Sequence, residues 1–167
     1  FPLSELATFR KINSRLQGHP TTHEGLPGIR VASGSLGQGM SVAVGAAQAK
    51  RLNGDDNLVY CLHGDGELQE GQIWEAAMYG AHNQLDNVIS FVDFNGQQID
   101  GPTDEILGLG DLAGKWRAFP PNAPEPASFV VWAEGQDYTK YTCTDVVIDV
   151  GVQTNISQRE IVYNTLK

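Results

Sequence analysis

Two short apolar runs, each followed by a polar turn, are the clearest hydrophobic pattern in the chain. Leu58 to Leu62 and Val88 to Val92 have the length and continuity typical of strands buried on both faces of a parallel sheet. Between them, from about Leu68 to Gln84, the pattern is helical. Small residues form one narrow face of this helix, which would let another helix approach closely: Ala76, Ala77, Gly80 and Ala81. The pattern predicts a strand–helix–strand unit with two parallel strands.

On the N-terminal side, two further helices are predicted. From Phe1 to Leu16, apolar residues recur near helical spacing, and Ser4 is a candidate N-cap. Two loops rich in Gly and Pro follow, over residues 17–30 and 31–39. The second loop leads into a helix from about Met40 to Leu52, ended by Asn53-Gly54. A Gly-rich loop before a helix leaves backbone N–H groups and little steric bulk beside a ligand.

The pattern changes after the second apolar run. A turn is expected at 100–104 and a short helix within 107–119, followed by a Pro-rich linker or surface loop at 120–127. Strands are expected at Phe129 to Trp132 and Thr144 to Val152, and a capping box at Ser157 opens a final helix to about Leu166. We therefore expect a partial α/β domain at 1–119, the linker at 120–127, and a β-rich C-terminal segment at 128–167 with no assigned role.

Composition excludes several classes of function. With 41% hydrophobic and 19% charged residues, the chain is typical of a soluble globular protein. The formal net charge of −9 argues against a nucleic-acid partner. No apolar run approaches the roughly 20 residues that span a bilayer, so no membrane partner is expected. Two cysteines and no leader sequence favour a reducing cytoplasm. An acidic protein that binds a diphosphate needs a metal between its carboxylates and the phosphates.

Oxygen ligands follow both predicted strands. Asp65 comes after the first run in a Gly-Asp-Gly turn, and Asn95 comes after the second. The carboxyl ends of parallel strands meet at one edge of a sheet, where ligands bind. Asp65, Asn95 and a backbone carbonyl such as that of Gln97 are oxygen ligands of the kind that Mg²⁺ prefers. Gly64 and Gly66 would leave room for the phosphates. The alternative is an ordinary Gly-Asp-Gly turn with Asn95 as a turn residue.

These motifs resemble a known family. Gly-Asp-Gly, with an Asn about thirty residues later, is similar to the thiamin-diphosphate fingerprint. The longer segment from Gly64 to Ala77 resembles transketolase, in particular the amino-terminal subunit of split transketolases. Two motifs before it add to the resemblance, Gly18-His-Pro20 and Gly34-Ser-Leu-Gly-Gln-Gly39. The resemblance covers about residues 6–119. It implies the diphosphate-binding half of a thiamin-diphosphate-binding fold, a parallel sheet flanked by helices, here incomplete.

The resemblance also implies roles for individual residues. It assigns the metal, Mg²⁺ or Ca²⁺, to Asp65, Asn95 and the Gln97 carbonyl, and a diphosphate contact to Gly66. The other implied roles are Gly34 and Leu36 beside the aminopyrimidine, His19 facing the ketose donor, and Glu70 and Glu75 in a carboxylate network between two cofactor sites. The alternative explanation is that both glutamates lie in the first turns of a helix, where a negative charge is favourable.

The implied reaction transfers a two-carbon ketol unit from a ketose phosphate to an aldose phosphate, with sugar phosphates as substrates. The family's catalytic glutamate lies in a different domain, so we expect a partner chain that carries the pyrimidine-binding domain, in a homo- or hetero-oligomer. Two alternatives stay open. One is the first subunit of a 2-oxo-acid dehydrogenase, and the other is a non-catalytic derivative that serves in binding or assembly.

Overall fold

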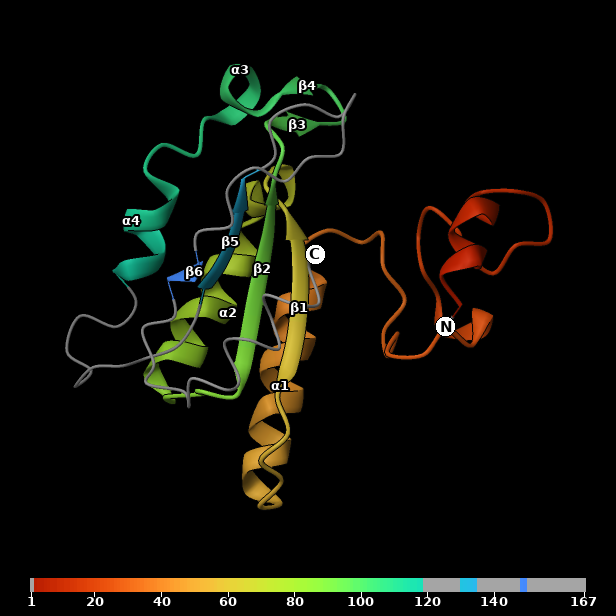
Figure 1. Cartoon of the computed structure of the whole chain (residues 1–167). Helices are drawn as coiled ribbons and strands as arrows, with labels where there is room; N and C mark the ends of the chain where they lie inside the picture. Colours follow the sequence, from red (N-terminus) through yellow and green to blue (C-terminus); the bar gives the residue numbers. More distant parts are fainter. Residues whose placement is uncertain (1, 119–129, 135–147, 150–167) are drawn as a thin grey trace.

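The computed structural model describes residues 2–118, 130–134 and 148–149 (Figure 1). Its centre is a sheet with the strand order β1-β2-β5-β6. β1 (Val59–Gly64) and β2 (Val88–Phe94) pair in parallel, and β5 (Val130–Glu134) pairs in parallel with the other edge of β2. β6 (Ile148–Asp149) is antiparallel to β5. The predicted parallel strand–helix–strand unit is confirmed, and β1 and β2 each extend two residues beyond the predicted end.

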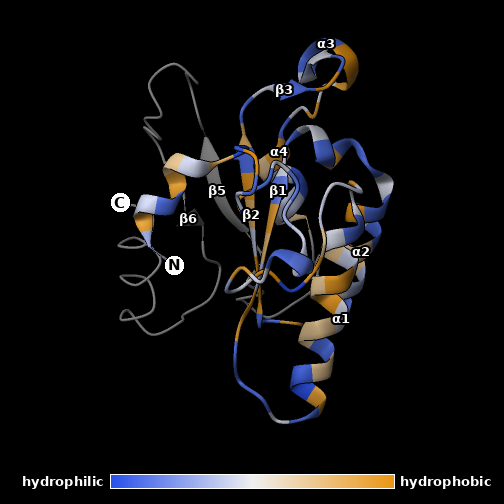
Figure 2. Cartoon of the chain, turned by 90° about the vertical axis from the view of Figure 1, so that its right-hand side faces the viewer, coloured by the Kyte–Doolittle hydropathy of each residue, from blue (hydrophilic) through white to orange (hydrophobic). Residues whose placement is uncertain are grey.

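α1 (Gln38–Leu52) and α2 (Gly71–His82) lie together along one face of this sheet, as both views show (Figures 1 and 2). The predicted narrow face of α2 is confirmed, because Ala76, Ala77, Gly80 and Ala81 are all buried. α1 contributes Met40, Ala43, Val44 and Ala47 to the same interior. Small side chains on both helices allow them to pack closely, as the sequence pattern predicted.

The prediction that the first apolar run is buried on both faces is wrong. Cys61 and His63 are buried, whereas Tyr60 is 57% and Leu62 73% exposed. Successive side chains of a strand point to opposite faces, and in the described part of the chain α1 and α2 cover only one face of β1. On the open face, the rings of Tyr60 and Phe91 stack with centroids 6.3 Å apart.

The predicted helix over Phe1 to Leu16 is also wrong beyond its first turns. A 3-10 helix, η1, spans Leu3–Thr8, and Pro2, not Ser4, stands at its N-cap without a side-chain bond. Arg10 and Asn13 have positive φ, which ends any helix here. η1 belongs to an N-terminal segment that lies apart from the sheet (red and orange in Figure 1). Helical spacing predicted a core helix, but four of its apolar residues are exposed: Leu3, Leu6, Phe9 and Ile12.

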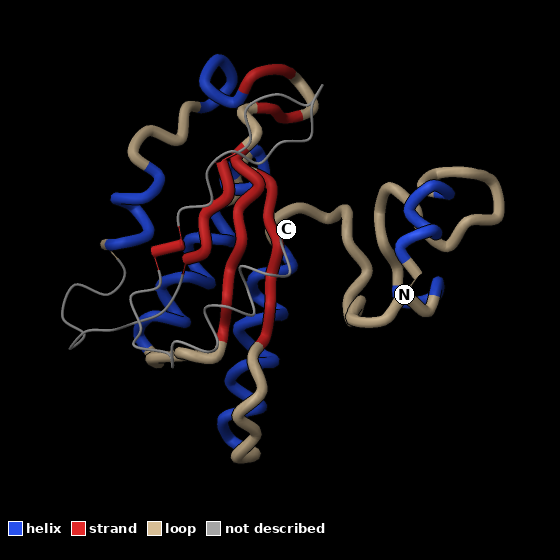
Figure 3. The backbone as a smooth tube through the Cα atoms, viewed as in Figure 1, coloured by secondary structure: helices blue, strands red, loops and turns tan. Residues whose placement is uncertain are grey.

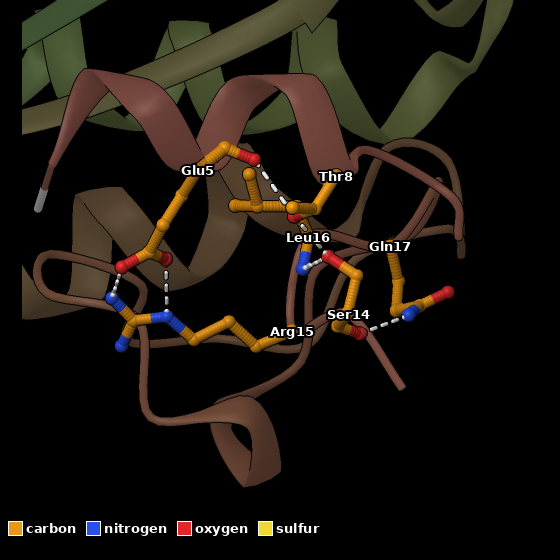
Figure 4. Close-up of polar contacts among 6 residues, drawn as sticks. All are labelled: Glu5, Thr8, Ser14, Arg15, Leu16 and Gln17. Atoms are coloured by element: carbon orange, nitrogen blue, oxygen red, sulfur yellow. Dashed lines mark hydrogen bonds and ion pairs between the residues drawn. The ribbon is translucent and has the colours of Figure 1, made fainter. Parts of the chain in front are cut away.

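Polar contacts hold this N-terminal segment to itself (Figure 4). Both guanidinium nitrogens of Arg15 that face Glu5 donate to its carboxylate, at 2.7 and 2.9 Å. The ion pair holds the pKa of Glu5 below its usual value. The Ser14 hydroxyl contacts Thr8 Oγ1 at 2.7 Å and accepts from the Leu16 N–H, while the Gln17 amide donates to the Ser14 carbonyl. A local hydrogen-bond network therefore replaces the predicted helix.

The predicted helix from Leu68 to Gln84 begins differently from expectation. A 3-10 turn, η3 (Gly66–Gln69), follows Asp65, and Glu70 is extended before α2 starts at Gly71. Leu68 is fully buried, and its carbonyl accepts from the Trp74 indole N–H at 2.9 Å. Burial of Leu68 and this bond fix a short turn that helical periodicity alone does not reveal.

The remaining described elements follow β2 (Figure 3). They are β3 (Gln97–Gln98), β4 (Gly101–Pro102), α3 (Thr103–Leu107) and α4 (Leu112–Arg117). The predicted turn at 100–104 is a hairpin leading into α3, which was not predicted. The predicted short helix within 107–119 is confirmed as α4, and its Leu112 and Trp116 are buried. η2 (Thr22–Glu24) is a single turn in the first loop.

Several expectations fall mainly outside the described residues. They include the Pro-rich linker at 120–127 and the final helix from Ser157 to Leu166. β5 overlaps the predicted strand from Phe129 to Trp132 and ends two residues later. β6 falls inside the predicted strand from Thr144 to Val152. Among the described residues, no helix is both long and apolar enough to traverse a bilayer.

Candidate functional site

Asp65 lies at the carboxyl end of β1 and links it to the turn after β2. The residue is fully buried. Its Oδ1 accepts from the Gly66 N–H at 2.9 Å, and its Oδ2 accepts from the Gly96 N–H at 2.8 Å. The hydroxyl of Thr103, also buried, lies 3.4 Å from the same Oδ2. One carboxylate therefore organises the ends of two neighbouring strands and the start of α3.

Asn95 opens the turn that Asp65 holds. Its Oδ1 accepts from the Gln97 N–H at 2.9 Å, and its Nδ2 donates to Asp93 Oδ2 at 3.1 Å. The carbonyl oxygen of Gln97 lies 3.1 Å from the point that a Cβ on Gly66 would occupy. The structure thus brings the predicted ligand Asp65, which follows β1, and the Gln97 carbonyl, in the turn that Asn95 opens after β2, to one edge of the sheet.

The oxygen atoms of Asp65, Asn95 and the Gln97 carbonyl suit a hard divalent cation. Each carboxylate and carbonyl oxygen has two lone pairs, so an oxygen that accepts one N–H can still accept a second partner. Within the described ranges, no group of three or more His, Cys, Asp or Glu side chains is placed to hold a metal. The predicted set has only one such residue, Asp65, and relies on amide and carbonyl oxygens for the rest. Such oxygen sets with few protein carboxylates are typical of Mg²⁺ sites that also bind phosphate.

Gly66 forms the cradle beside this edge. A Cβ at this position would lie 2.5 Å from Gln98 Cβ, too close for any side chain, and would press on the Gln97 carbonyl. Gly64, at the end of β1, is half-buried. Only glycine at position 66 allows the β3 backbone to approach the Asp65 turn this closely. This approach brings the Gln97 carbonyl beside the Asp65 turn, and these oxygens fit a divalent metal.

His19 and Gly34 come together although they lie in different loops. Gly34 has φ +111°, and a Cβ on it would lie 3.2 Å from Cγ and Nδ1 of His19. The Ser33 N–H donates to the Pro20 carbonyl at 3.0 Å, which joins the two loops directly. His19 and Gly34 are both exposed, and Leu36 is 50% exposed. This pair can therefore face a ligand.

Gly37 connects the loop of Gly34 and Leu36 to the Asp65 turn. It is buried with φ +85°, and its N–H donates to Glu67 Oε1 at 2.9 Å. A Cβ on Gly37 would lie 3.1 Å from Glu70 Cβ. Glu70 and Glu75 are both exposed, at the start and in the middle of α2. The structure thus places Glu70 against the Gly-rich loop.

Two buried titratable groups lie below the site on β1. Burial raises the pKa of the Cys61 thiol to about 12, and the nearby Glu67 carboxylate adds to this shift. Burial lowers the pKa of His63, while Glu67 Oε2, 3.8 Å from His63 Nδ1, opposes the shift. Neither ring nitrogen of His63 has a hydrogen-bond partner among the described residues. Burial therefore favours the neutral form of His63.

Sequence reasoning missed four residues of this site: Gly37, Glu67, Gly96 and Thr103. Glu67 had a sequence signal, because it is an acidic residue directly after Gly-Asp-Gly. Thr103 had none, because it lies 38 residues after Asp65. Only the tertiary structure brings its hydroxyl to the carboxylate.

The sequence profile described as "Transketolase, thiamine diphosphate binding domain" matches residues 1–122. The chain belongs to this transketolase family. The resemblance inferred from the motifs is confirmed. Asp65, Asn95 and the Gly-rich loop all fall inside the matched region.

Curated relatives include subunits of two transketolases. The 6-deoxy-6-sulfo-D-fructose transketolase subunit of Clostridium sp. (strain MSTE9) is 46% identical over 119 residues, which are 71% of this chain and 43% of the relative. An apulose-4-phosphate transketolase subunit of Phocaeicola vulgatus is 45% identical over 112 residues, 67% of this chain and 39% of the relative. The chain thus spans about two fifths of the length of these relatives.

Solved transketolase structures share the fold. The crystal structure of the transketolase from Campylobacter jejuni matches with a TM-score of 0.55 and 35% identity, over 69% of this chain and 19% of that one. The transketolase from Leishmania mexicana matches with a TM-score of 0.58 and 34% identity, over 71% of this chain and 19% of that one. The predicted α/β class is confirmed, as an incomplete form of the thiamin-diphosphate-binding fold.

Proposed function

We propose that this transketolase-family chain supplies the metal-and-diphosphate half of a thiamin-diphosphate site that transfers two-carbon ketol units. The observation that carries the proposal is the buried Asp65 carboxylate. Its hydrogen bond from the Gly96 N–H fixes the turn after β2, and the Gln97 carbonyl lies beside Gly66. A carboxylate, an amide oxygen and a backbone carbonyl beside a glycine cradle support binding of Mg²⁺ together with a diphosphate.

Each predicted site residue then has a distinct task. Asp65, Asn95 and the Gln97 carbonyl would hold Mg²⁺, and Ca²⁺ is an alternative ion for the same oxygens. Gly64 and Gly66 would leave space for the phosphates. Gly34 and Leu36 would lie against the aminopyrimidine, and His19, packed on Gly34, would face the ketose. Glu70 and Glu75 would belong to the carboxylate network at an interface with a partner.

The proposed reaction moves a two-carbon ketol unit between sugar phosphates. Bound thiamin diphosphate supplies the carbon nucleophile that accepts this unit, while the protein positions the cofactor and substrates. The relatives are named for different sugars, a sulfofructose and apulose 4-phosphate. We therefore propose a ketose with an anionic end as the donor and an aldose phosphate as the acceptor.

The proposal includes a partner. The Clostridium and Phocaeicola relatives are named as subunits, and the resemblance implies that the catalytic glutamate lies in a separate pyrimidine-binding domain. We therefore propose a homo- or hetero-oligomer in the cytoplasm, with residues 1–119 as the cofactor-binding part, residues 120–127 as a linker and residues 128–167 as a C-terminal segment that adds β5 and β6 to the sheet. This chain alone is expected to bind cofactor without turning over substrate.

Calorimetric titration of thiamin diphosphate into this chain, with and without Mg²⁺, tests the proposal. Binding that requires Mg²⁺ is expected. No binding to protein shown by circular dichroism to be folded would contradict the proposal and favour a non-catalytic role in assembly. If binding occurs, adding a chain that carries the pyrimidine-binding domain should yield ketol transfer. Activity with a 2-oxo acid instead would contradict the proposed reaction.

Replacing Gly66 with alanine is expected to weaken Mg²⁺-dependent cofactor binding by about 10- to 100-fold, the range typical when groups that orient metal ligands are disturbed. The added methyl would collide with Gln98 and displace the Gln97 carbonyl. Titration calorimetry would measure the change. Gly71→Ala is the matched control, because a Cβ there meets nothing within 4 Å. Equal affinities of the two variants would contradict the assigned role of the Gln97 carbonyl.

A further inference from the structure

We infer that Glu67 is a positioning residue that fastens the Gly34–Gly37 loop to the Asp65 turn. This inference deepens the proposed function and rests on it, because it concerns how the two cofactor-facing segments keep their spacing. Glu67 does not belong to the metal, phosphate, aminopyrimidine or interface residues considered above. Its two carboxylate oxygens bind backbone N–H groups from two different parts of the chain.

The first of these bonds crosses between elements far apart in the sequence. Glu67 Oε1 accepts from the Gly37 N–H at 2.9 Å, across 30 residues. Gly37 is buried, has φ +85° and stands at the N-cap of α1. Because Gly37 is a buried residue, the carboxylate gives its N–H a hydrogen-bond partner where little water is available.

The second bond fixes the other segment. Glu67 Oε2 accepts from the Gly64 N–H at 3.2 Å, one residue before Asp65. A carboxylate that accepts on both oxygens holds the two donors at a fixed separation. The loop expected beside the aminopyrimidine and the turn expected to hold the metal are therefore joined through a single side chain, which is only 15% exposed.

Capping of η3 is the simpler explanation of Glu67, but the contacts do not favour it. The first N–H of η3, that of Gly66, is already bound by Asp65 Oδ1 at 2.9 Å. Glu67 instead reaches back to Gly64 and outward to Gly37. Packing at Gly37 supports the same connection, because Glu70 and Gln72 side chains lie within van der Waals reach of a Cβ built there.

Removal of this link should leave the Asp65 turn in place and loosen the Gly-rich loop. Asp65 keeps its own bonds from Gly66 and Gly96, which do not involve Glu67. Loss of a charge-assisted hydrogen bond of this kind typically costs about 10- to 100-fold in an equilibrium constant. Thiamin diphosphate affinity should fall by this factor while the metal ligands remain arranged.

Amide hydrogen exchange measured by NMR, combined with calorimetry, tests the inference on Glu67→Ala and Glu67→Gln. In Glu67→Ala, the Gly37 amide should exchange at least about 10-fold faster while the Gly96 amide, bound by Asp65, is unchanged. Glu67→Gln keeps one carbonyl oxygen, so both Gly37 protection and cofactor affinity should lie between those of Glu67→Ala and the parent chain. Glu105→Gln, on an exposed residue of α3, is the control for loss of one negative charge.

The outcomes separate this inference from the proposed function. Unchanged protection of the Gly37 amide, or equal acceleration at Gly37 and Gly96, would overturn the positioning role. Unchanged thiamin diphosphate affinity in both Glu67 variants would overturn it as well. If the parent chain itself fails to bind the cofactor, the proposed function fails, whereas the exchange comparison still decides whether Glu67 holds the loop. Should Glu67→Ala not fold, Glu67→Gln carries the same comparison.

Discussion

Replacing Asp65 with asparagine is expected to lower the Mg²⁺-dependent affinity for thiamin diphosphate by more than about 100-fold, since even residues that only orient a metal ligand cost 10- to 100-fold. Asparagine preserves the shape of the side chain but removes its charge. Its NH2 group would also turn a donor toward either the Gly66 N–H or the Gly96 N–H, which now donate to the two carboxylate oxygens. Titration calorimetry with and without Mg²⁺ would measure the loss.

Asp56→Asn is the matched control for this experiment. Asp56 is exposed and precedes β1, at the opposite end of the strand from Asp65, so the variant loses the same charge without touching the site. Its affinity should equal that of the parent chain. Asp65→Asn should also lose about 1.5–3 kcal/mol of stability through its charged hydrogen bonds. Titrations are therefore made well below its melting temperature, and an undiminished affinity there would refute the metal site.

Replacing Leu68 with alanine is expected to lower the free energy of unfolding by about 2–5 kcal/mol. Leu68 is fully buried in the cluster that includes Met40, Ile73 and Trp116. It also directly follows the Asp65–Glu67 turn, so the cavity would lie beneath the site. Urea unfolding followed by tryptophan fluorescence would measure the loss. Trp74 reports on this region because its indole donates to the Leu68 carbonyl.

Leu52→Ala provides the comparison on the surface. Leu52 ends α1 and is 77% exposed, so the same truncation removes almost no buried surface. Its free energy of unfolding should stay within about 0.5 kcal/mol of the parent value. A loss of similar size in both variants would show that Leu68 is not part of a packed core.

The sequence predicted the central unit because local pattern and tertiary packing agree there. The apolar runs became β1 and β2, and the Ala76–Ala77–Gly80–Ala81 face became the buried contact of α2. The location of the candidate site was also predictable from the order of the elements. Asp65 and Asn95 follow parallel strands, so both lie at the same edge of the sheet. The motifs around them were specific enough to indicate the family.

The same reasoning failed where local pattern had no packing partner. Leu3, Leu6 and Phe9 have near-helical spacing, yet they are exposed and the segment is held by the Glu5–Arg15 pair and its neighbours. Periodicity predicts a face but not what covers it, and a helix this short gains its stability from tertiary packing. Tyr60 and Leu62 were misjudged for the same reason, because the apolar run did not reveal which side the helices occupy.

By itself, the sequence determined the strand–helix–strand unit, the family and the identity of the predicted oxygen ligands, because these depend on residue type, short spacing and the order of elements. Only the tertiary structure decided that Gly96 and Thr103 meet the Asp65 carboxylate, that His19 packs on Gly34, and that Glu67 joins Gly37 to Gly64. These contacts link residues that lie in different segments and, apart from Glu67 and Gly64, are separated by 15 to 38 positions. Their geometry follows from how the strands pair and how the loops pack, which no local sequence pattern encodes.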